Sequence, residues 1–117
     1  MVKRTTTELI AYEAPGHFGV TTMRIHGKEE TGAQKFWMGL STYLPGGGAE
    51  WGYEDNPLEK VYYVPEGEMT VTDKNGKEYV IHKDESITLL PNEGRGLVNK
   101  SNFPARMLVI INYPDTK

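Results

Sequence analysis

The chain has 117 residues, of which 38% are hydrophobic and 25% charged, and its formal net charge is −3. This composition is ordinary for a globular protein with one modest core. The small negative charge, without a block of Lys or Arg, excludes the electrostatic footprint of a nucleic-acid-binding protein. The absence of cysteine excludes disulfides, thiolate metal sites and cysteine nucleophiles. No apolar run could span a membrane and no signal peptide is evident, so we expect a cytoplasmic protein with no membrane partner.

The N-terminal third contains short runs typical of β-strands, separated by turn residues. We expect an edge strand at 9–12, ended by Pro15-Gly16, and a second strand at 20–26, where β-branched residues are frequent. Residues 27–32 are predicted to form a charged loop. The apolar stretch 35–44 fits a helix or a strand by length, but Gly39 and the flanking glycines favour a strand. The glycines at 46–48 are interpreted as a turn.

The rest of the chain follows the same pattern. Residues 60–64 form a strand-like run in which Lys60, Tyr62 and Val64 share one face. Residues 69–73 and 78–82 flank Asn75-Gly76, which can supply the positive φ angles of a type I′ hairpin turn. Further strands are expected at 86–90, 94–99 and 105–112. Short strands at regular intervals, without helical periodicity, predict an all-β sandwich or barrel.

Two stretches have a distinctive spacing of turn and strand residues. The first contains Pro45-Gly46, Pro57, Glu59, Val61-Tyr-Tyr-Val64 and Gly67-Glu68, and the second runs from Lys83 to Asn99. Together they resemble the two sequence motifs of the cupins, small β-barrels that often hold one metal ion. The resemblance covers roughly residues 35–112.

This resemblance implies a fold for the chain. It predicts a single cupin-like double-stranded β-helix, or jelly-roll barrel, as one domain over residues 1–117, with N-terminal strands and an arm at 1–34. It also implies a homodimer, a prediction supported by the apolar side chains Val61 and Tyr63 on the strand face away from the barrel interior.

The resemblance also locates the metal position of the family, in the mouth of the barrel. The residues that stand at the four usual ligand positions are Glu54, Asn56, Lys60 and Arg95. A guanidinium has no lone pair to donate, and a lysine ligates a metal only after losing its proton. We therefore expect no metal and no other cofactor there. A second alignment, with paired ligands at Tyr53 and Asp55, fits Pro57 less well.

The replaced ligands predict a pocket for a small anionic, carboxylate-bearing molecule. Arg95 would grip the carboxylate with its planar fork, and Lys60 would add a second positive charge. Glu54 would carry a proton, and Lys60 with a lowered pKa could act as a base or a Schiff-base amine. The other expected ligand contacts are Asn56, Tyr62, Asn99, Trp37 and Trp51. We expect a metal-independent isomerase or lyase that moves a proton next to a carboxylate.

Three alternatives remain open. A non-catalytic binding or sensor module for a small acid would also need Arg95 and Lys60. Glu54, Lys60 and Arg95 could instead form a buried ion-pair network without a ligand. Lastly, His17 and His26 from a neighbouring subunit could rebuild a divalent-metal site with Glu54, as in a metal-dependent oxygenase or lyase with atypical ligands.

Overall fold

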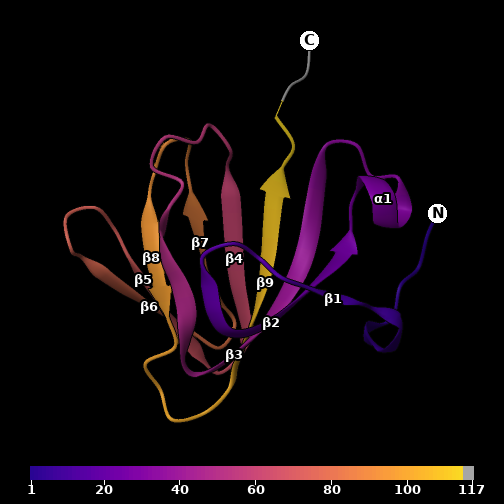
Figure 1. The fold of residues 1–117 in the computed structure, drawn as a ribbon. Helices are drawn as coiled ribbons and strands as arrows, with labels where there is room; N and C mark the ends of the chain where they lie inside the picture. The colour runs from indigo at the N-terminus through magenta and orange to yellow at the C-terminus, as the bar shows by residue number, and fades with distance from the viewer. Residues whose placement is uncertain (115–117) are drawn as a thin grey trace.

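The computed structural model describes residues 1–114, whose strands form one sheet that curls into a nearly closed β-barrel (Figure 1). No helix in this part of the chain is long and apolar enough to cross a membrane. The elements in chain order are η1 (Thr6–Glu8), β1 (Ala11–Tyr12), β2 (His17–His26), α1 (Lys28–Thr31), β3 (Phe36–Gly52), β4 (Lys60–Glu66), β5 (Glu68–Thr72), β6 (Glu78–His82), β7 (Glu85–Leu89), β8 (Arg95–Val98) and β9 (Ala105–Asn112).

The strand order closes the barrel. Hydrogen bonding follows the path β6-β5-β8-β3-β9-β4-β7, and the pairings within residues 1–114 are all antiparallel. The two ends of this path, β6 and β7, also contact each other. β2 pairs with β3 and carries β1, so the N-terminal strands lie on the opposite side of the molecule from the β5–β6 hairpin (Figure 1). The predicted all-β jelly-roll barrel is confirmed.

Each strand predicted from the sequence is present, but the expected loop at 27–32 is wrong. Residues 28–31 form one turn of α-helix, α1, which Gly32 ends with a left-handed φ of +80°. A glycine adopts this conformation without a steric penalty and is a common helix stop. The many charged residues of this segment correctly predicted that it lies at the surface, but they did not predict its helical conformation.

The predicted turn at the glycines 46–48 is also wrong, because β3 continues through them to Gly52. Tyr43 of β3 pairs with Ala105 of β9, whereas Gly48 pairs with Val98 of β8. The glycine run is therefore the place where one long strand passes from one neighbour to another. This change of partner is what brings the residues after Gly48 to the pocket described below.

The hairpin between β5 and β6 is confirmed, with a different turn from the one expected. A two-residue type I′ turn needs positive φ angles at both central residues. Here Gly76 has a φ of +81°, whereas Asn75 is not among the residues with positive φ. The backbone N–H of Gly76 donates to the Asp73 carbonyl at 3.1 Å. The loop is thus closed by a single left-handed glycine.

The inward face of β4 contributes to two different parts of the barrel interior. Lys60, Tyr62 and Val64 are all buried, as the alternation predicts. Val64 packs in the hydrophobic core, whereas Lys60 is a charged residue at the other end of the same strand. Val61 and Tyr63 lie on the outer face and are half-buried. The homodimer that they suggested stays a prediction.

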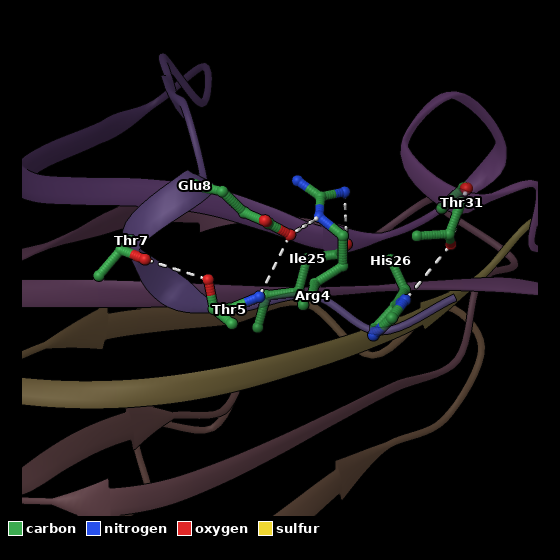
Figure 2. A network of polar contacts seen from close by, with 8 residues as sticks. Arg4, Thr5, Thr7, Glu8, Ile25, His26 and Thr31 are labelled. Atoms are coloured by element: carbon green, nitrogen blue, oxygen red, sulfur yellow. Dashed lines mark hydrogen bonds and ion pairs between the residues drawn. The ribbon is translucent and has the colours of Figure 1, made fainter. Parts of the chain in front are cut away.

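The N-terminal arm is fastened to β2 (Figure 2). The guanidinium of Arg4 donates through Nε to the Glu8 carboxylate at 3.0 Å and through Nη1 to the Ile25 carbonyl at 3.1 Å. Close by, His26 Nδ1 lies 3.3 Å from Thr31 Oγ1 of α1, which Figure 2 also shows. These contacts hold the segment before β1 against the end of β2, and they place His26 beside α1.

Candidate functional site

A cavity of about 520 Å³ opens into the barrel and is lined by side chains from both the N-terminal strands and the barrel strands. Aromatic side chains form much of its wall: Tyr12, Trp37, Tyr43, Trp51, Tyr53 and Tyr62. The charged residues of its lining, within the described part of the chain, are Arg24, Glu50 and Arg95, and His17 lies with them. The volume suits a drug-sized or sugar-sized molecule.

Arg95 is held firmly in the lining. It lies on β8 with only 3% of its surface exposed. Its Nε donates to the Tyr62 hydroxyl at 3.1 Å, and its Nη1 donates to the Glu50 carbonyl at 2.9 Å. Burial raises the pKa of Tyr62, and the charge of Arg95 opposes that rise. The protein itself therefore uses two of the three guanidinium nitrogens, and this fixes the direction of the third.

Lys60 is a fully buried cation, with 0% of its surface exposed. Its Nζ donates to the Leu58 carbonyl at 3.3 Å and lies 4.0 Å from the centre of the Tyr53 ring. The guanidinium of Arg95 lies 5.0 Å from the same ring, so Tyr53 contacts both cations. Burial, followed by the charge of Arg95, lowers the pKa of Lys60.

These two cations have no carboxylate partner in the described part of the chain. None of its ion pairs within 4.0 Å involves Lys60 or Arg95. The alternative in which Glu54, Lys60 and Arg95 form a buried ion-pair network is therefore not observed. Tyr53 has a φ of +68°, which is uncommon for a residue other than glycine. Unusual backbone conformations of this kind cluster at functional sites.

The loop after β3 places the predicted residues Glu54 and Asn56 differently. Asn56 is half-buried in the pocket lining, and its Oδ1 accepts the backbone N–H of Leu58 at 2.9 Å. Glu54 is exposed and is not one of the lining residues. It packs with Trp51 against Gly94, because a Cβ at Gly94 would lie within 2.5 Å of the Trp51 ring and 3.2 Å of the Glu54 Cβ. Glu54 therefore lies at the rim of the pocket.

Asn99 does not belong to the pocket lining. Its side chain is fully buried, and its Nδ2 donates to the carbonyls of Tyr43 at 3.2 Å and Phe103 at 2.8 Å. Its Oδ1 accepts from the backbone N–H of Ser101 at 3.0 Å and from the Ser101 hydroxyl at 2.7 Å. The four contacts tie the turn before β9 to β3. Asn99 therefore stabilises this turn and does not contact the pocket.

The other predicted contacts fall on the pocket. Tyr62, Trp37 and Trp51 all line it, with Tyr62 buried and Trp51 largely exposed at the opening. His17 also lines it, and its Nδ1 lies 2.9 Å from the Pro15 carbonyl. His82 is exposed at the end of β6 beside Glu85, with 3.1 Å between Nδ1 and Oε1.

Sequence reasoning missed two charged residues of the lining, Arg24 and Glu50. Arg24 lies on β2, before either motif begins. The sequence alternation puts Arg24 on the same strand face as Thr22, which the structure shows to be buried, but it does not reveal that this face meets the pocket. Glu50 follows the glycine bend in β3, where the predicted turn hid the continuation of the strand. Both omissions follow from looking for the site only at the motif positions.

The residues at the usual metal position of this kind of barrel do not fit a metal ion. Arg95 offers only donor N–H groups, and Lys60 Nζ already lies against the Tyr53 ring. Within residues 1–114, no group of three His, Asp or Glu side chains could hold a metal ion. We therefore assign no step of any reaction to a metal at this position.

Comparisons with known proteins agree with the barrel and its motifs. The Cupin domain family matches residues 39–111. Beta-D-galactosidase Rv1717 of Mycobacterium tuberculosis is 40% identical over 103 residues, which cover 88% of this chain and 86% of that protein. The polyketide cyclase RemF of Streptomyces resistomycificus has a similar structure, with a TM-score of 0.82 and 24% identity over 96% of this chain and 80% of that one.

A third similar protein is a sugar phosphate isomerase of the cupin superfamily from Silicibacter pomeroyi, with a TM-score of 0.79 and 20% identity. That match covers 97% of this chain and 76% of the isomerase. At such identities the two structural matches show a shared fold and leave the activity open. The family match spans most of the barrel, from within β3 to within β9, and it includes both motifs. The chain therefore belongs to the cupin superfamily.

Proposed function

We propose that this chain binds a galactose-type sugar in the barrel pocket and hydrolyses its glycosidic bond by acid–base chemistry. The observation that carries this proposal is the lining itself, which combines an aromatic wall with the carboxylate residue Glu50. Aromatic faces pack against the apolar faces of a sugar ring, and a few polar groups orient its hydroxyls. The relative at 40% identity, named as a β-D-galactosidase, supports the choice of sugar and reaction.

Glycoside hydrolysis ordinarily needs two carboxyl groups, one on each side of the scissile bond. Glu50 lies in the lining, and Glu54 follows at the exposed rim beside Trp51. We assign the protonation of the leaving oxygen to Glu50, because it is the exposed carboxylate residue of the cavity lining. Glu54 has access to solvent, and we assign it the activation of the attacking water. This keeps the proton-carrying role predicted for Glu54 and adds the partner that the sequence did not reveal.

Hydrolysis of 4-nitrophenyl β-D-galactopyranoside by the purified full chain tests this proposal. Glu50→Gln should lower kcat by roughly 100-fold or more, the usual size of a lost general acid or base. Glu54→Gln should lower kcat by at least about 10-fold. Asp55→Asn, on the same exposed loop, is the matched control and should change kcat by less than about threefold. Absence of hydrolysis by the unaltered chain would show that the proposed reaction is wrong.

A second function has a specific observation in its favour. Lys60 and Arg95 have no carboxylate within 4.0 Å in residues 1–114. Of the two only Arg95 lines the cavity, so a ligand with a negative charge would lie beside Arg95, with the buried Lys60 behind Tyr53. This supports the expected pocket for a small carboxylic acid, with a metal-independent isomerase or lyase activity or with binding alone. A melting-temperature screen against small carboxylates tests it, because a ligand that binds only the folded state raises the melting temperature. Binding without product formation would favour a sensor.

A further inference from the structure

We propose that the bound sugar carries an anionic group and that Arg24 is the residue that selects for it. This inference rests on the proposed binding of a galactose-type sugar and names the class of sugar more narrowly. Neither motif of the barrel contains Arg24, which lies on β2 ahead of the residues that match the family.

The backbone and two aromatic rings position Arg24 before any ligand binds. Arg24 pairs with Gly39 of β3, and a Cβ at Gly39 would lie 3.0 Å from Cζ3 of the Trp37 ring. The glycine therefore leaves room for Trp37 to lie across the strand. The guanidinium of Arg24 lies 4.5 Å from the centre of the Trp37 ring and 4.9 Å from that of Tyr12. Contact with two aromatic faces holds the cation in one orientation.

One N–H group of the Arg24 guanidinium, that of Nε, makes no hydrogen bond within residues 1–114. Its Nε is buried and has no hydrogen-bond partner in the described part of the chain. No carboxylate there lies within 4.0 Å of its guanidinium. Arg95, in contrast, donates both to Tyr62 and to the Glu50 carbonyl. Leaving a buried N–H without a partner is costly, and an anionic group beside the guanidinium would offset this cost.

The charges around the cavity favour an anion. Two arginines and one carboxylate residue, Glu50, line it, and the buried Lys60 lies behind Tyr53. Burial raises the pKa of Tyr12, the charge of Arg24 and its side-chain hydrogen bonding to Tyr12 oppose this, and Glu30 makes only a smaller contribution. The charge of Glu30 therefore lies near enough to raise the pKa of Tyr12, yet Glu30 forms no ion pair with Arg24. Arg24 thus has no ion pair within 4.0 Å in residues 1–114, and an anionic ligand group would supply one.

A guanidinium fork fits the paired oxygens of a carboxylate or a phosphate, and it fits them better than a single hydroxyl. The sugar expected here is therefore an acidic derivative of galactose, either a uronic acid or a sugar phosphate. The neutral ring would contact the aromatic wall, and the anionic group would face Arg24. Because the rings hold Arg24 in place, little conformational entropy is lost when the anion binds.

The test is isothermal titration calorimetry of the full chain with D-galacturonate, D-galactose 6-phosphate and D-galactose. We expect at least one of the two acidic sugars to bind roughly 10-fold or more tightly than galactose, and the arms identify which anionic group is preferred. Arg24→Gln should weaken binding of that acidic sugar by roughly 10- to 100-fold, the size of a lost hydrogen bond to a charged group, and should remove most of its preference over galactose. Arg106→Gln, on β9 and outside the pocket lining, is the matched control.

The possible results separate this inference from the function on which it rests. If galactose binds as tightly as both acidic sugars, the anionic class is wrong and the sugar proposal stands. If an acidic sugar is preferred but Arg24→Gln binds it unchanged, the role of Arg24 is wrong. If none of the three sugars binds, both proposals fail. Should Arg24→Gln not fold, added salt still tests the anionic class in the unaltered chain, because it should weaken only the binding of the acidic sugar. Arg24→Lys, which keeps the charge and removes the planar fork, then tests the role of Arg24 and should also weaken that binding.

Discussion

The two ends of the barrel interior are built from the same strands and have opposite chemistry. At the packed end, Val64, Met69, Ile81 and Ala105 are buried in the hydrophobic core and do not line the cavity. At the pocket end, Lys60 and Arg95 are just as deeply buried, and they meet across the ring of Tyr53. Lys60 and Val64 even share the inward face of β4.

The two ends of the barrel interior contribute differently to stability. Burying apolar side chains stabilises the folded chain, whereas burying a cation without a carboxylate costs free energy. The packed end therefore holds the barrel together, and the pocket end lowers its stability. A cost of this kind is typical of functional sites, where a ligand supplies the missing interaction. Removing a buried apolar side chain at the packed end should lower the free energy of unfolding, whereas removing the buried charge at the pocket end should raise it.

Truncation of the packed end should destabilise the protein without changing the pocket. Met69 has 0% of its surface exposed. Met69→Ala should lower the free energy of unfolding by about 2–5 kcal/mol, because it removes buried apolar atoms and leaves a cavity. Urea denaturation followed by circular dichroism measures this change. Val80→Ala, at an exposed residue of the neighbouring strand β6, is the control. A loss below about 0.5 kcal/mol for Met69→Ala would contradict the assignment of Met69 to the packed end.

Asn99 is a buried polar residue whose side-chain nitrogen and oxygen both have hydrogen-bond partners. Asn99→Ala should lower the free energy of unfolding by about 2–3 kcal/mol, since it removes the side-chain partners of the Tyr43 carbonyl and the Ser101 N–H and one of the two donors to the Phe103 carbonyl. Asn102→Ala, exposed in the same turn, should have little effect. The same variants should bind ligands as the parent does. A selective loss of ligand binding in Asn99→Ala would restore the binding role expected from the sequence.

Removal of the buried charge at the pocket end should have the opposite sign. Lys60→Met keeps most of the volume and removes the cation, so it should raise the free energy of unfolding by about 1 kcal/mol at neutral pH. Lys74→Met, at an exposed hairpin residue, should leave stability unchanged. Chemical denaturation of the three proteins at equal salt measures both effects. A destabilised Lys60→Met would mean that Lys60 contributes net stability through the Tyr53 ring.

The pH dependence of this gain follows from the lowered pKa of Lys60. Between the folded-state pKa and the ordinary value of 10.5, the unfolded chain binds more protons than the folded one. Stability therefore rises with pH in this window, because the penalty for a buried charge disappears once Lys60 is neutral. The advantage of Lys60→Met should be largest at neutral pH and should shrink as the pH approaches 10.5. A gain that stays constant with pH would contradict a lowered pKa of Lys60 in the folded chain.

The sequence by itself determined the strands and the family. Alternation is a local property, so the inward face of β4 and the hairpin of β5 and β6 could be assigned without the fold. The spacing of the two motifs predicted a cupin barrel over about 35–112, and the family match at 39–111 agrees. Lys60, Tyr62 and Arg95 lie together because these motifs fix which strands are neighbours.

Only the tertiary structure decided the rest of the pocket. Arg24 reaches it because β2 pairs with β3, a long-range contact that no local pattern of residues 17–26 reveals. Glu54 and Asp55 are exposed because the chain turns at Tyr53, with its φ of +68°, and leaves the alternation that the motif assumes. Asn99 faces a turn because the carbonyls of two separate segments converge on it. The periodicity of a strand can be read from residues that are neighbours in the sequence. A pocket is lined by residues far apart in the sequence, which only the closed barrel brings together.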